Sequence, residues 1–567
     1  MKRCPECGRD YNDDSMSFCL DDGSELLFGP ALMDEPATAI LPAPSAAGGL
    51  THPTDESELK TAMLRPSATG GGSDSARGFD KRLLGFPILF AIIVLGGFLG
   101  YRYFSTPSTK QIDSIAVMPF VNESGNADVE YLSDGMTETL INSLSKIPNL
   151  SVKARSTVFS YKGQISDPAD IGRRLAVQAV LNGRVVQRGD DITLYLSLVD
   201  ARTGDQIWGD SYERKLADLA LLQKEVTRDV SRNLREHLSG ADVSRLTKNY
   251  TDDAEAYQFY ARGRHHLLKA THPDILASIR NFQQAIELDP GYALAYVGLA
   301  DAFRAPVAET DPAEALARSK AAAQKAIELD DTLADAHAVM GWIAFWYEWD
   351  WEASERNLRR AIELDGNNAE AHLFYSHLLS NTGRHAEALL EARRARELDP
   401  LNIRINALEG QYLIHAGQVD EGLARLQATK ELDPNSWMAH LFSTSGYIEK
   451  SMFAEAIAEG HKTVELSPHS RSFSFLAVAL AKAGRQAEAR KELQTILNMS
   501  RERWISPYSV ALVYNALGDR EQTLSWLERA LTERDPRMVF LKVEPKWNNL
   551  RSDPQFQNLL KRLNFPA

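Results

Sequence analysis

The chain has little cysteine: three residues, all within the first 19, and none in the rest of its 567 residues. A fold held together by disulfides, as in small exported proteins, is therefore excluded. The opening stretch MKRCPECGRD contains no apolar run, so we expect no signal peptide. The net charge is −14, whereas a general nucleic-acid binder carries a basic face, so nucleic acid is not an expected partner.

The sequence also lacks the common catalytic signatures. It contains no G-x-x-x-x-G-K-[ST] phosphate loop, no H-E-x-x-H helix, no G-x-S-x-G elbow and no kinase set of glycine-rich loop, H-R-D and D-F-G. We therefore predict that the chain is not an enzyme.

The three cysteines lie in the segment CPECGRDYNDDSMSFCLDDG. Cys4 and Cys7 form a C-x-x-C knuckle, and Asp22 follows Cys19 at the position where a fourth cysteine would complete the set. Residues 1–27 thus resemble a minimal zinc ribbon, because zinc accepts thiolates and a carboxylate in tetrahedral geometry. We expect zinc on Cys4, Cys7, Cys19 and Asp22. The alternative is a ribbon that no longer holds metal.

Residues 28–82 are rich in Pro, Ala, Ser, Thr and Gly and show no sustained apolar period, which is typical of a disordered linker. Within this linker, TAILP at Thr38 and TAMLRP at Thr61 are near-copies. An exposed threonine followed by leucine is a candidate phosphorylation and docking site. Coincidence in an Ala/Pro-rich segment is the alternative.

An uncharged run of 19 residues, LLGFPILFAIIVLGGFLGY, lies between Arg82 and Arg102. At about 1.5 Å per residue it spans roughly the 30 Å hydrocarbon core, so we predict that residues 83–104 cross a membrane once. A buried core helix is the alternative. Basic residues are more numerous before the run than after it, which indicates a cytoplasmic N-terminus. We expect a single-pass protein of the bacterial inner membrane with periplasmic C-terminal domains.

Residues 110–240 mix strand and helix patterns. SIAVMPFV is a short apolar strand, and VEYLSDGMTETLINSLSKI carries apolar residues at helical spacing. LSVKAR indicates a second strand, and AVLNGRVVQRGDDITLYLSLVDARTGDQIWGDSYER indicates three strands with Gly-Asp and Thr-Gly turns. A long amphipathic helix follows from about Lys215 to Leu238. These patterns predict a compact α/β domain.

One phrase recurs over residues 252–536, first as NFQQAIELDP. The residue after EL in successive copies is Asp289, Asp330, Asp365, Asp399, Asp433 and Ser467. The spacing settles at 34 residues, and each copy holds two helical stretches joined by a tight turn. A single helix pair cannot bury its apolar face, so we predict a solenoid of seven or eight stacked pairs. Residues 537–567 are predicted to form a helical cap.

The repeat tract resembles the tetratricopeptide repeat (TPR) family, because HAEALLEARRARELDP places Ala388, Ala395 and Pro400 where that family has small residues and a proline. SIAVMPF, LSDGMTETLINSL and GRVVQRGDDITLYLSLVDARTGDQIWGDSYER are similar to the TolB amino-terminal and FlgO-like domains of bacterial envelope proteins. Relatives with this domain order place a cyclase, a kinase or a winged-helix DNA reader in front, and none is visible here. The predicted fold class is multidomain: zinc ribbon, transmembrane helix, α/β TolB N-terminal-like domain and all-α TPR solenoid.

GWIAFWYEWDWEA holds four of the nine tryptophans. Trp342 and Trp346 stand one helical turn apart on the first helix of their repeat, a face that lines an extended concave groove in such arrays. Packing between repeats is the simpler explanation of these tryptophans. The predicted groove residues that contact a partner are Trp342, Trp346, His377 and Gln411.

The favoured hypothesis is a membrane-anchored TPR scaffold in the bacterial envelope that binds a protein or peptide in its groove. The alternative is a transmembrane signalling or regulatory receptor whose zinc ribbon contacts a cytoplasmic kinase or nucleic acid. An enzyme related to cyclase fusions is a third reading, and the missing catalytic module argues against it.

Overall fold

The computed structural model describes three short strands near the amino terminus and then residues 112–126, 130–164, 166–234, 248, 250–305 and 312–566. The chain divides into two compact units, residues 1–105 and 106–567. In the first unit, β1 (Lys2–Arg3) pairs antiparallel with both β2 (Asp10–Tyr11) and β3 (Leu27–Phe28).

Four of the predicted features fall outside the described residues: the zinc ligands, the linker over 28–82 apart from Phe28, which belongs to β3, its two threonines and the membrane span over 83–104. Within the part of the chain that the structure describes, no helix is long and apolar enough to cross a bilayer.

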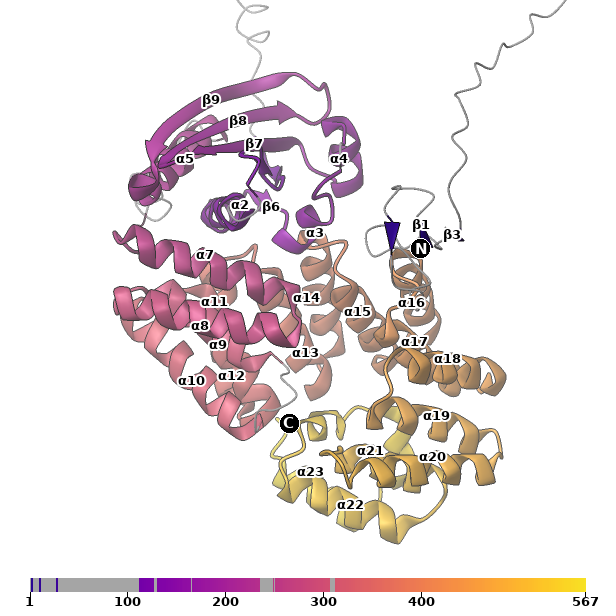
Figure 1. The fold of residues 1–567 in the computed structure, drawn as a ribbon. Coiled ribbons are helices and arrows are strands. Elements are labelled where there is room, and N and C mark those ends of the chain that lie inside the picture. The colour runs from indigo at the N-terminus through magenta and orange to yellow at the C-terminus, as the bar shows by residue number, and fades with distance from the viewer. Residues whose placement is uncertain are drawn as a thin grey trace, which may run out of the picture. The chain divides into compact units, whose positions relative to one another are not determined.

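The second unit begins with an α/β domain (Figure 1). Its strands are β4 (Ser114–Val117), β5 (Val121–Asn122), β6 (Ser151–Val152), β7 (Ala179–Arg188), β8 (Asp191–Asp200) and β9 (Gln206–Lys215). Its helices are α2 (Glu130–Leu144), α3 (Arg155–Phe159), α4 (Pro168–Leu175), η2 (Leu216–Asp218) and α5 (Leu219–Leu234). The strand order is β6-β4-β7-β8-β9, with β5 paired to β7. Strand β4 runs parallel to β6 and β7, whereas β7, β8 and β9 form an antiparallel meander.

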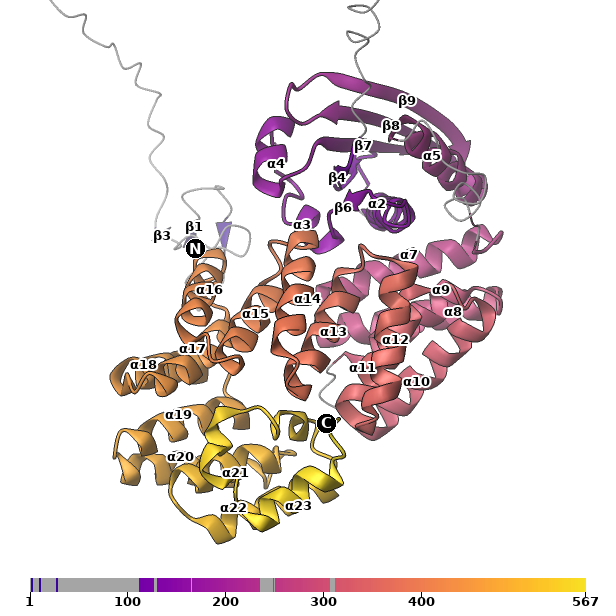
Figure 2. The ribbon, with the colours of Figure 1, turned by 180° about the vertical axis from the view of Figure 1, so that it is seen from behind.

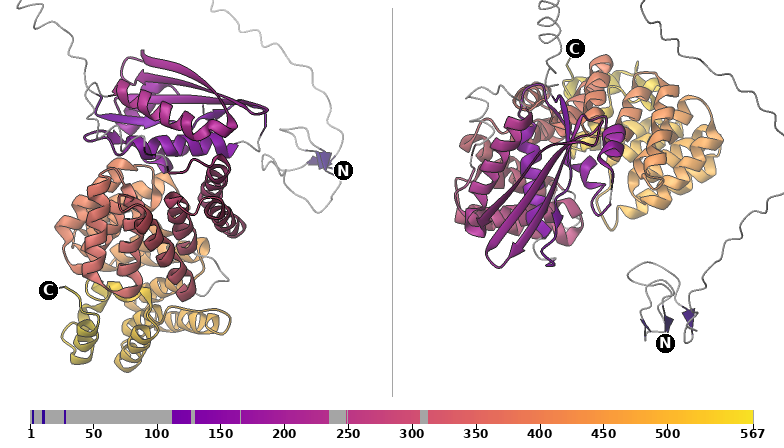
Figure 3. Two further views of the ribbon diagram at one scale, coloured as in Figure 1. Left: turned by 90° about the vertical axis from the view of Figure 1, so that its left-hand side faces the viewer. Right: turned by 90° about the horizontal axis from the view of Figure 1, so that it is seen from above.

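Side-chain alternation along β8 explains how this sheet buries one face. Ile192, Leu194 and Leu196 are buried, whereas Tyr195 between them is exposed. Helices α2 and α5 cover the buried face and separate the sheet from the repeats (Figures 1 and 3). The β7–β8 turn contains Gly189 at φ +61°, a backbone conformation that glycine adopts without strain.

The predicted meander and the helices before and after it are present. The predicted strand LSVKAR is shorter than expected, because only Ser151 and Val152 pair with β4 and the chain enters α3 at Arg155. The hydrophobic pattern does not indicate α3 or α4. Helix α3 is only five residues long and packs against the repeats. Tertiary contacts therefore stabilise it, and no local sequence pattern predicts it.

Residues 254–532 form eight antiparallel helix pairs, a TPR-like solenoid. The pairs are α7 (Ala254–Lys269) with α8 (His272–Leu288), α9 (Ala293–Arg304) with α10 (Pro312–Leu329), α11 (Ala334–Ile343) with α12 (Trp351–Leu364), α13 (Ala369–Thr382) with α14 (His385–Leu398), α15 (Ile403–His415) with α16 (Val419–Leu432), α17 (Trp437–Glu449) with α18 (Phe453–Leu466), α19 (Ser470–Lys482) with α20 (Gln486–Met499), and α21 (Pro507–Ala516) with α22 (Arg520–Thr532). A cap of η4 (Pro536–Phe540), η5 (Pro545–Leu550) and α23 (Pro554–Arg562) follows. We call the first helix of each pair its A helix.

The recurring aspartate after EL shapes the turn between pairs. Asp289, Asp365 and Asp433 each accept a hydrogen bond from the backbone N–H two residues ahead, at 2.9 Å. This Asx turn ends one helix and directs the chain into the next A helix. The recurring sequence motif therefore forms the same turn between successive helix pairs.

The α/β domain contacts two of these turns, and Lys248, which follows the domain in the chain, contacts a third. Lys248 pairs with Asp330 at 2.8 Å, and the Ser145 hydroxyl donates to Asp365 at 2.7 Å. At the next turn, the Thr157 hydroxyl donates to Asp399 at 2.6 Å. The same repeating carboxylate thus joins the two domains.

Candidate functional site

The A helices supply most of the lining of a partly open cavity of about 480 Å³, which we call the chamber. All four residues predicted to contact a partner line it: Trp342, Trp346, His377 and Gln411. They come from three consecutive pairs, the third to the fifth. The structure therefore brings the four together, and their contact with a partner stays a prediction.

Trp342 and Trp346 are half-buried in the chamber wall. The Trp346 ring stacks on the His377 ring with a centroid distance of 5.0 Å and an interplanar angle of 28°. Trp342 lies 6.4 Å from Phe374, and the Arg304 guanidinium lies 5.5 Å from the Trp342 ring. Both tryptophans pack against neighbouring repeats while keeping part of their surface accessible, so packing and ligand contact are compatible roles.

Trp346 belongs to a π-helical turn, η3 (Ala344–Glu348), at the end of α11. The chain from Asp335 to Trp349 is one residue longer than the chain from Glu370 to Gly383 in the next pair. A π-turn is an α-helix with one inserted residue, so η3 takes up this extra residue. Trp346 lies within this π-turn and lines the chamber.

Trp349 ends η3 with φ +54°, where the next pair has Gly383 at φ +92°. A left-handed backbone is strained for a bulky residue, and π-turns and such strain both concentrate at functional sites. Ala270 and Ser451 adopt the same backbone conformation after α7 and α17, so what sets the third pair apart among the described pairs is the π-turn, whose Phe345 and Trp346 line the chamber.

His377 and Gln411 are more deeply buried, with 5% and 4% of their surfaces exposed. The Nδ1 atom of His377 lies 2.6 Å from the Tyr412 hydroxyl oxygen. Within the described residues, Nε2 of His377 and Oε1 of Gln411 have no hydrogen-bond partner. Burial, followed by the positive charges of Arg404 and Arg471, holds the pKa of His377 well below its usual range, so the ring is neutral.

The C-terminal cap closes one side of the chamber, a contact that the predicted extended groove does not include. Phe540 of η4 packs edge-on against Trp346 and His377, with centroid distances of 5.8 and 5.7 Å. The Trp351 indole N–H donates to the Leu563 carbonyl at 3.0 Å, and the C-terminus lies beside α12 (Figures 1 and 2). The cap after the eighth pair therefore contacts the third and fourth pairs.

A buried ion pair holds the cap from within. Lys546 donates to Glu544 at 2.8 Å and to the Ser445 hydroxyl, and His415 lies 3.9 Å from Glu544. Burial raises the pKa of Glu544, but the Lys546 and His415 charges outweigh burial and hold that pKa below its usual value. Glu544 is thus ionised and already has a cationic partner.

The second residue of the A helix is acidic in the third and fourth pairs and basic in the fifth and seventh pairs, with a methionine between the two basic residues. These residues are Asp335, Glu370, Arg404, Met438 and Arg471. Arg304 pairs with Glu370 at 2.8 Å, which leaves Arg404 a contact of 3.7 Å to the same carboxylate oxygen. The two arginines were not among the predicted groove residues, which occupy other positions of the A helices. Reading this one position across the 34-residue period would have found them.

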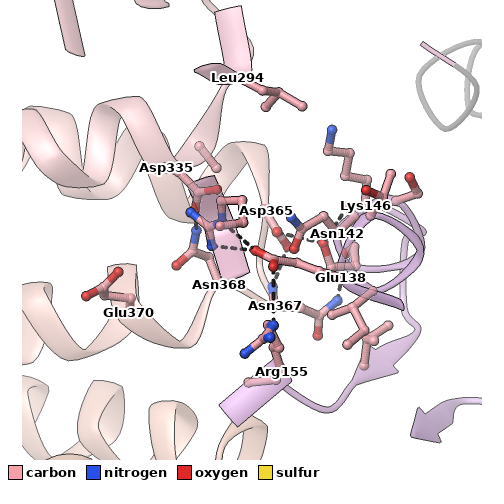
Figure 4. Close-up of a pocket in the computed structure, with 18 of the residues that line it drawn as sticks. Glu138, Asn142, Lys146, Arg155, Leu294, Asp335, Asp365, Asn367, Asn368 and Glu370 are labelled. Carbon is pink, nitrogen blue, oxygen red and sulfur yellow. Dashed lines mark hydrogen bonds and ion pairs between the residues drawn. The ribbon is translucent and has the colours of Figure 1, made fainter. Parts of the chain in front are cut away.

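A second cavity of about 420 Å³ lies between α2, α3 and the A helices (Figure 4). Glu138 of α2 accepts from Arg264 at 2.7 Å and lies 3.2 Å from Arg155. Asp335 faces this cavity, where the Asn368 amide donates to it at 2.6 Å. Burial and the nearby Asp301 raise the pKa of Asp335 to about 6. The two cavities share lining residues, among them Arg264 and Arg404.

The remaining predicted site residues lie outside the described part of the chain: Cys4, Cys7, Cys19, Asp22, Thr38 and Thr61. Among the residues that the structure does describe, no group of three or more His, Cys, Asp or Glu side chains is arranged to hold a metal ion.

Comparisons with known proteins identify relatives of parts of the chain. Residues 110–236 match the family described as HilA/YgeH-like transcriptional regulator, second domain. The TolB and FlgO resemblance of this domain stays an expectation. A protein of Rhizobium meliloti (strain 1021) named "Putative adenylate cyclase 3" is 32% identical over 248 residues, which is 42% of this chain. The chain spans about two fifths (41%) of the length of that relative.

Solved TPR structures are similar to parts of the repeat region. The protein YrrB, described as a TPR protein with an unusual peptide-binding site, is 23% identical, with a TM-score of 0.26, and the match covers 34% of this chain and 95% of YrrB. A chain of the APC/C hetero-tetramer Cut9–Hcn1 is 15% identical, with a TM-score of 0.38, and the match covers 61% and 63% of the two chains. Because these TM-scores are low, the assignment of TPR-like repeats rests on the helix pairs seen in this chain.

Proposed function

We propose that the second unit is a non-enzymatic protein-binding scaffold and that a polypeptide partner enters the chamber. The carrying observation is the chamber itself: a partly open cavity walled by half-buried tryptophans, in which polar atoms of His377 and Gln411 have no partner among the described residues. Buried polar atoms are nearly always hydrogen-bonded in a finished structure, so orphaned atoms beside a cavity favour a missing ligand.

Substitution of a chamber tryptophan tests this proposal. Trp342→Ala in the full-length chain should weaken partner capture about thirtyfold, because aromatic anchors typically carry about 2 kcal/mol or more of binding energy. Trp504→Ala is the matched control, because Trp504 is 56% exposed and lies outside the chamber. Circular dichroism and thermal melting must show both variants folded. Equal capture by the two variants would contradict the proposal.

We further propose that the chain is anchored in the bacterial inner membrane by residues 83–104, with a cytoplasmic N-terminus. The uncharged run and the basic residues before it support this topology. A cysteine introduced after Lys110 should react with a membrane-impermeant reagent in intact spheroplasts. A cysteine that reacts only after lysis would place residues 105–567 on the other side.

The first unit is proposed to bind one zinc ion through Cys4, Cys7, Cys19 and Asp22. The support is that β1 ends at Arg3, just before the knuckle, and pairs with both β2 and β3. Such a small unit depends on metal for folding, so chelation should release one zinc per chain and leave residues 1–27 disordered, with a loss of chemical-shift dispersion of their amide signals in NMR spectra. Purified reduced protein without stoichiometric zinc would refute this.

The second candidate function is a transmembrane regulatory receptor, in which the zinc ribbon contacts a cytoplasmic kinase or nucleic acid. The observation that favours it is that the α/β domain matches a transcriptional-regulator domain and that a relative is named as a cyclase. The double variant Cys4→Ser/Cys7→Ser separates the two candidates. If it loses the captured partners while Trp342→Ala keeps them, the receptor replaces the scaffold. Phosphopeptide mapping at Thr38 and Thr61 tests the linker sites of such a receptor.

A further inference from the structure

Arg471 is a cation in the chamber that lacks a carboxylate. Its guanidinium lies 5.4 Å from the Phe442 ring, 5.6 Å from Phe475 and 5.5 Å from Phe540. Within the described residues it makes neither a hydrogen bond nor an ion pair, and the nearby Glu544 is bound to Lys546. Stacking occupies the faces of a guanidinium and leaves the N–H donors in its plane available. Arg471 is therefore held in place with its hydrogen-bonding capacity unused.

Arg404 adds a second positive charge two pairs earlier. It lies 5.4 Å from the Phe374 ring, and the ion pair that it makes within the described residues is the 3.7 Å contact to Glu370. Arg304 already holds that carboxylate at 2.8 Å, so Arg404 is only weakly neutralised. Both arginines line the chamber and both lower the pKa of His377, which places the two charges around the same ring.

We propose that the chamber recognises an acidic segment of its partner polypeptide, whose Asp or Glu side chains bind Arg471 and Arg404 while apolar side chains contact Trp342 and Trp346. This inference rests on the proposed function and names the chemistry of the partner. The chain as a whole carries a charge of −14, so two under-neutralised arginines inside one cavity are a local exception that complements negative charge. The arginines stand on alternate A helices, α15 and α19, which suits separate side-chain carboxylates rather than one terminal carboxylate.

Blocked peptides test the charge requirement. The probes are N-acetylated, C-amidated decapeptides with two Glu residues one to four positions apart beside a Phe, and a matched series with Gln in place of Glu. Binding to the full-length protein is measured by fluorescence anisotropy. We expect the tightest Glu peptide to bind at least about tenfold more strongly than its Gln match, as charge-assisted hydrogen bonds require. Arg471→Met should remove most of this ratio, and Arg471→Lys should restore part of it.

Arg485→Met is the matched control, because Arg485 is exposed, pairs with Glu488 at 2.6 Å and lies outside the chamber. The proposal is overturned if the Glu and Gln series bind equally, if only unblocked peptides bind, if neither series binds, or if Arg471→Met keeps the ratio. An unfolded Arg471→Met variant would show that the arginine is a structural stacking group, and this too would overturn the proposal. If one of these contradicting outcomes is found while a partner polypeptide still cross-links inside the chamber, the proposed scaffold function remains supported and only the proposed acidic character of the partner is wrong.

Discussion

Replacement of Asp399 should separate the α/β domain from the repeats. This carboxylate is 2% exposed and accepts hydrogen bonds from the hydroxyls of Ser156 and Thr157 on α3 and from the Asn402 amide. Asp399→Ala removes all three bonds and leaves their donors without an acceptor. Asp433→Ala removes the same residue one repeat later, where a single bond from the Asn435 backbone N–H is lost.

The difference between the two variants follows from the number and burial of these bonds. A hydrogen bond to a charged group contributes about 1.5–3 kcal/mol, and contributions within one network are less than additive. We expect Asp399→Ala to lower the free energy of unfolding by about 3–5 kcal/mol and Asp433→Ala by about 1 kcal/mol.

Urea denaturation with hydrogen exchange measures both the magnitude and the place of the effect. In Asp399→Ala, hydrogen exchange should quicken at the amides of α3 more than at those of α17 and α18. The reason is that α3 loses its hydrogen bonds to Asp399, while the distant helix pairs keep their contacts. Asp433→Ala should leave α3 protected. Equal destabilisation by the two substitutions would refute the claim that Asp399 holds the α/β domain against the repeats through its hydrogen bonds to α3.

Asp335→Asn should flatten the pH dependence of stability. Burial raises the pKa of Asp335 to about 6 from an ordinary value of 3.8, so its contribution is complete below about pH 4 and is lost as the pH rises through 6. Urea midpoints of both proteins at pH 4 and pH 7 check this, and an unchanged slope would contradict it. Trp351→Phe should loosen the cap, because the Leu563 carbonyl loses its donor, with a loss of about 1–2 kcal/mol. Hydrogen exchange should then quicken in α23 and not in α7, and protection that stays equal in both helices would count against closure by this bond.

Local regularities made the repeats and the meander predictable. A 34-residue period, a recurring turn aspartate and strict alternation in β8 are properties of short stretches of sequence. The extra residue between Asp335 and Trp349 also stands in the sequence as a longer spacing, and a comparison across copies would have predicted the π-turn.

Closure of the chamber was not predictable in this way. Phe540 meets Trp346 and His377 only because the superhelix brings the eighth pair back to the third and fourth, and no local pattern records that curvature. The docking of α3 on Asp399 is equally non-local, since each partner is satisfied by residues about 240 positions away. Helical periodicity placed Trp342 and Trp346 on the groove face of their helix, and all four predicted groove residues line the chamber.

Site-specific photo-cross-linking in living cells tests the central claim, that a polypeptide occupies the chamber. A benzophenone amino acid replaces Met438, which lines the chamber, or Leu390, which is 64% exposed on α14 outside it. The account predicts a light-dependent adduct with another polypeptide from position 438, absent at position 390 and diminished by Trp342→Ala. Adducts of equal yield from both positions, or none from position 438, would contradict it.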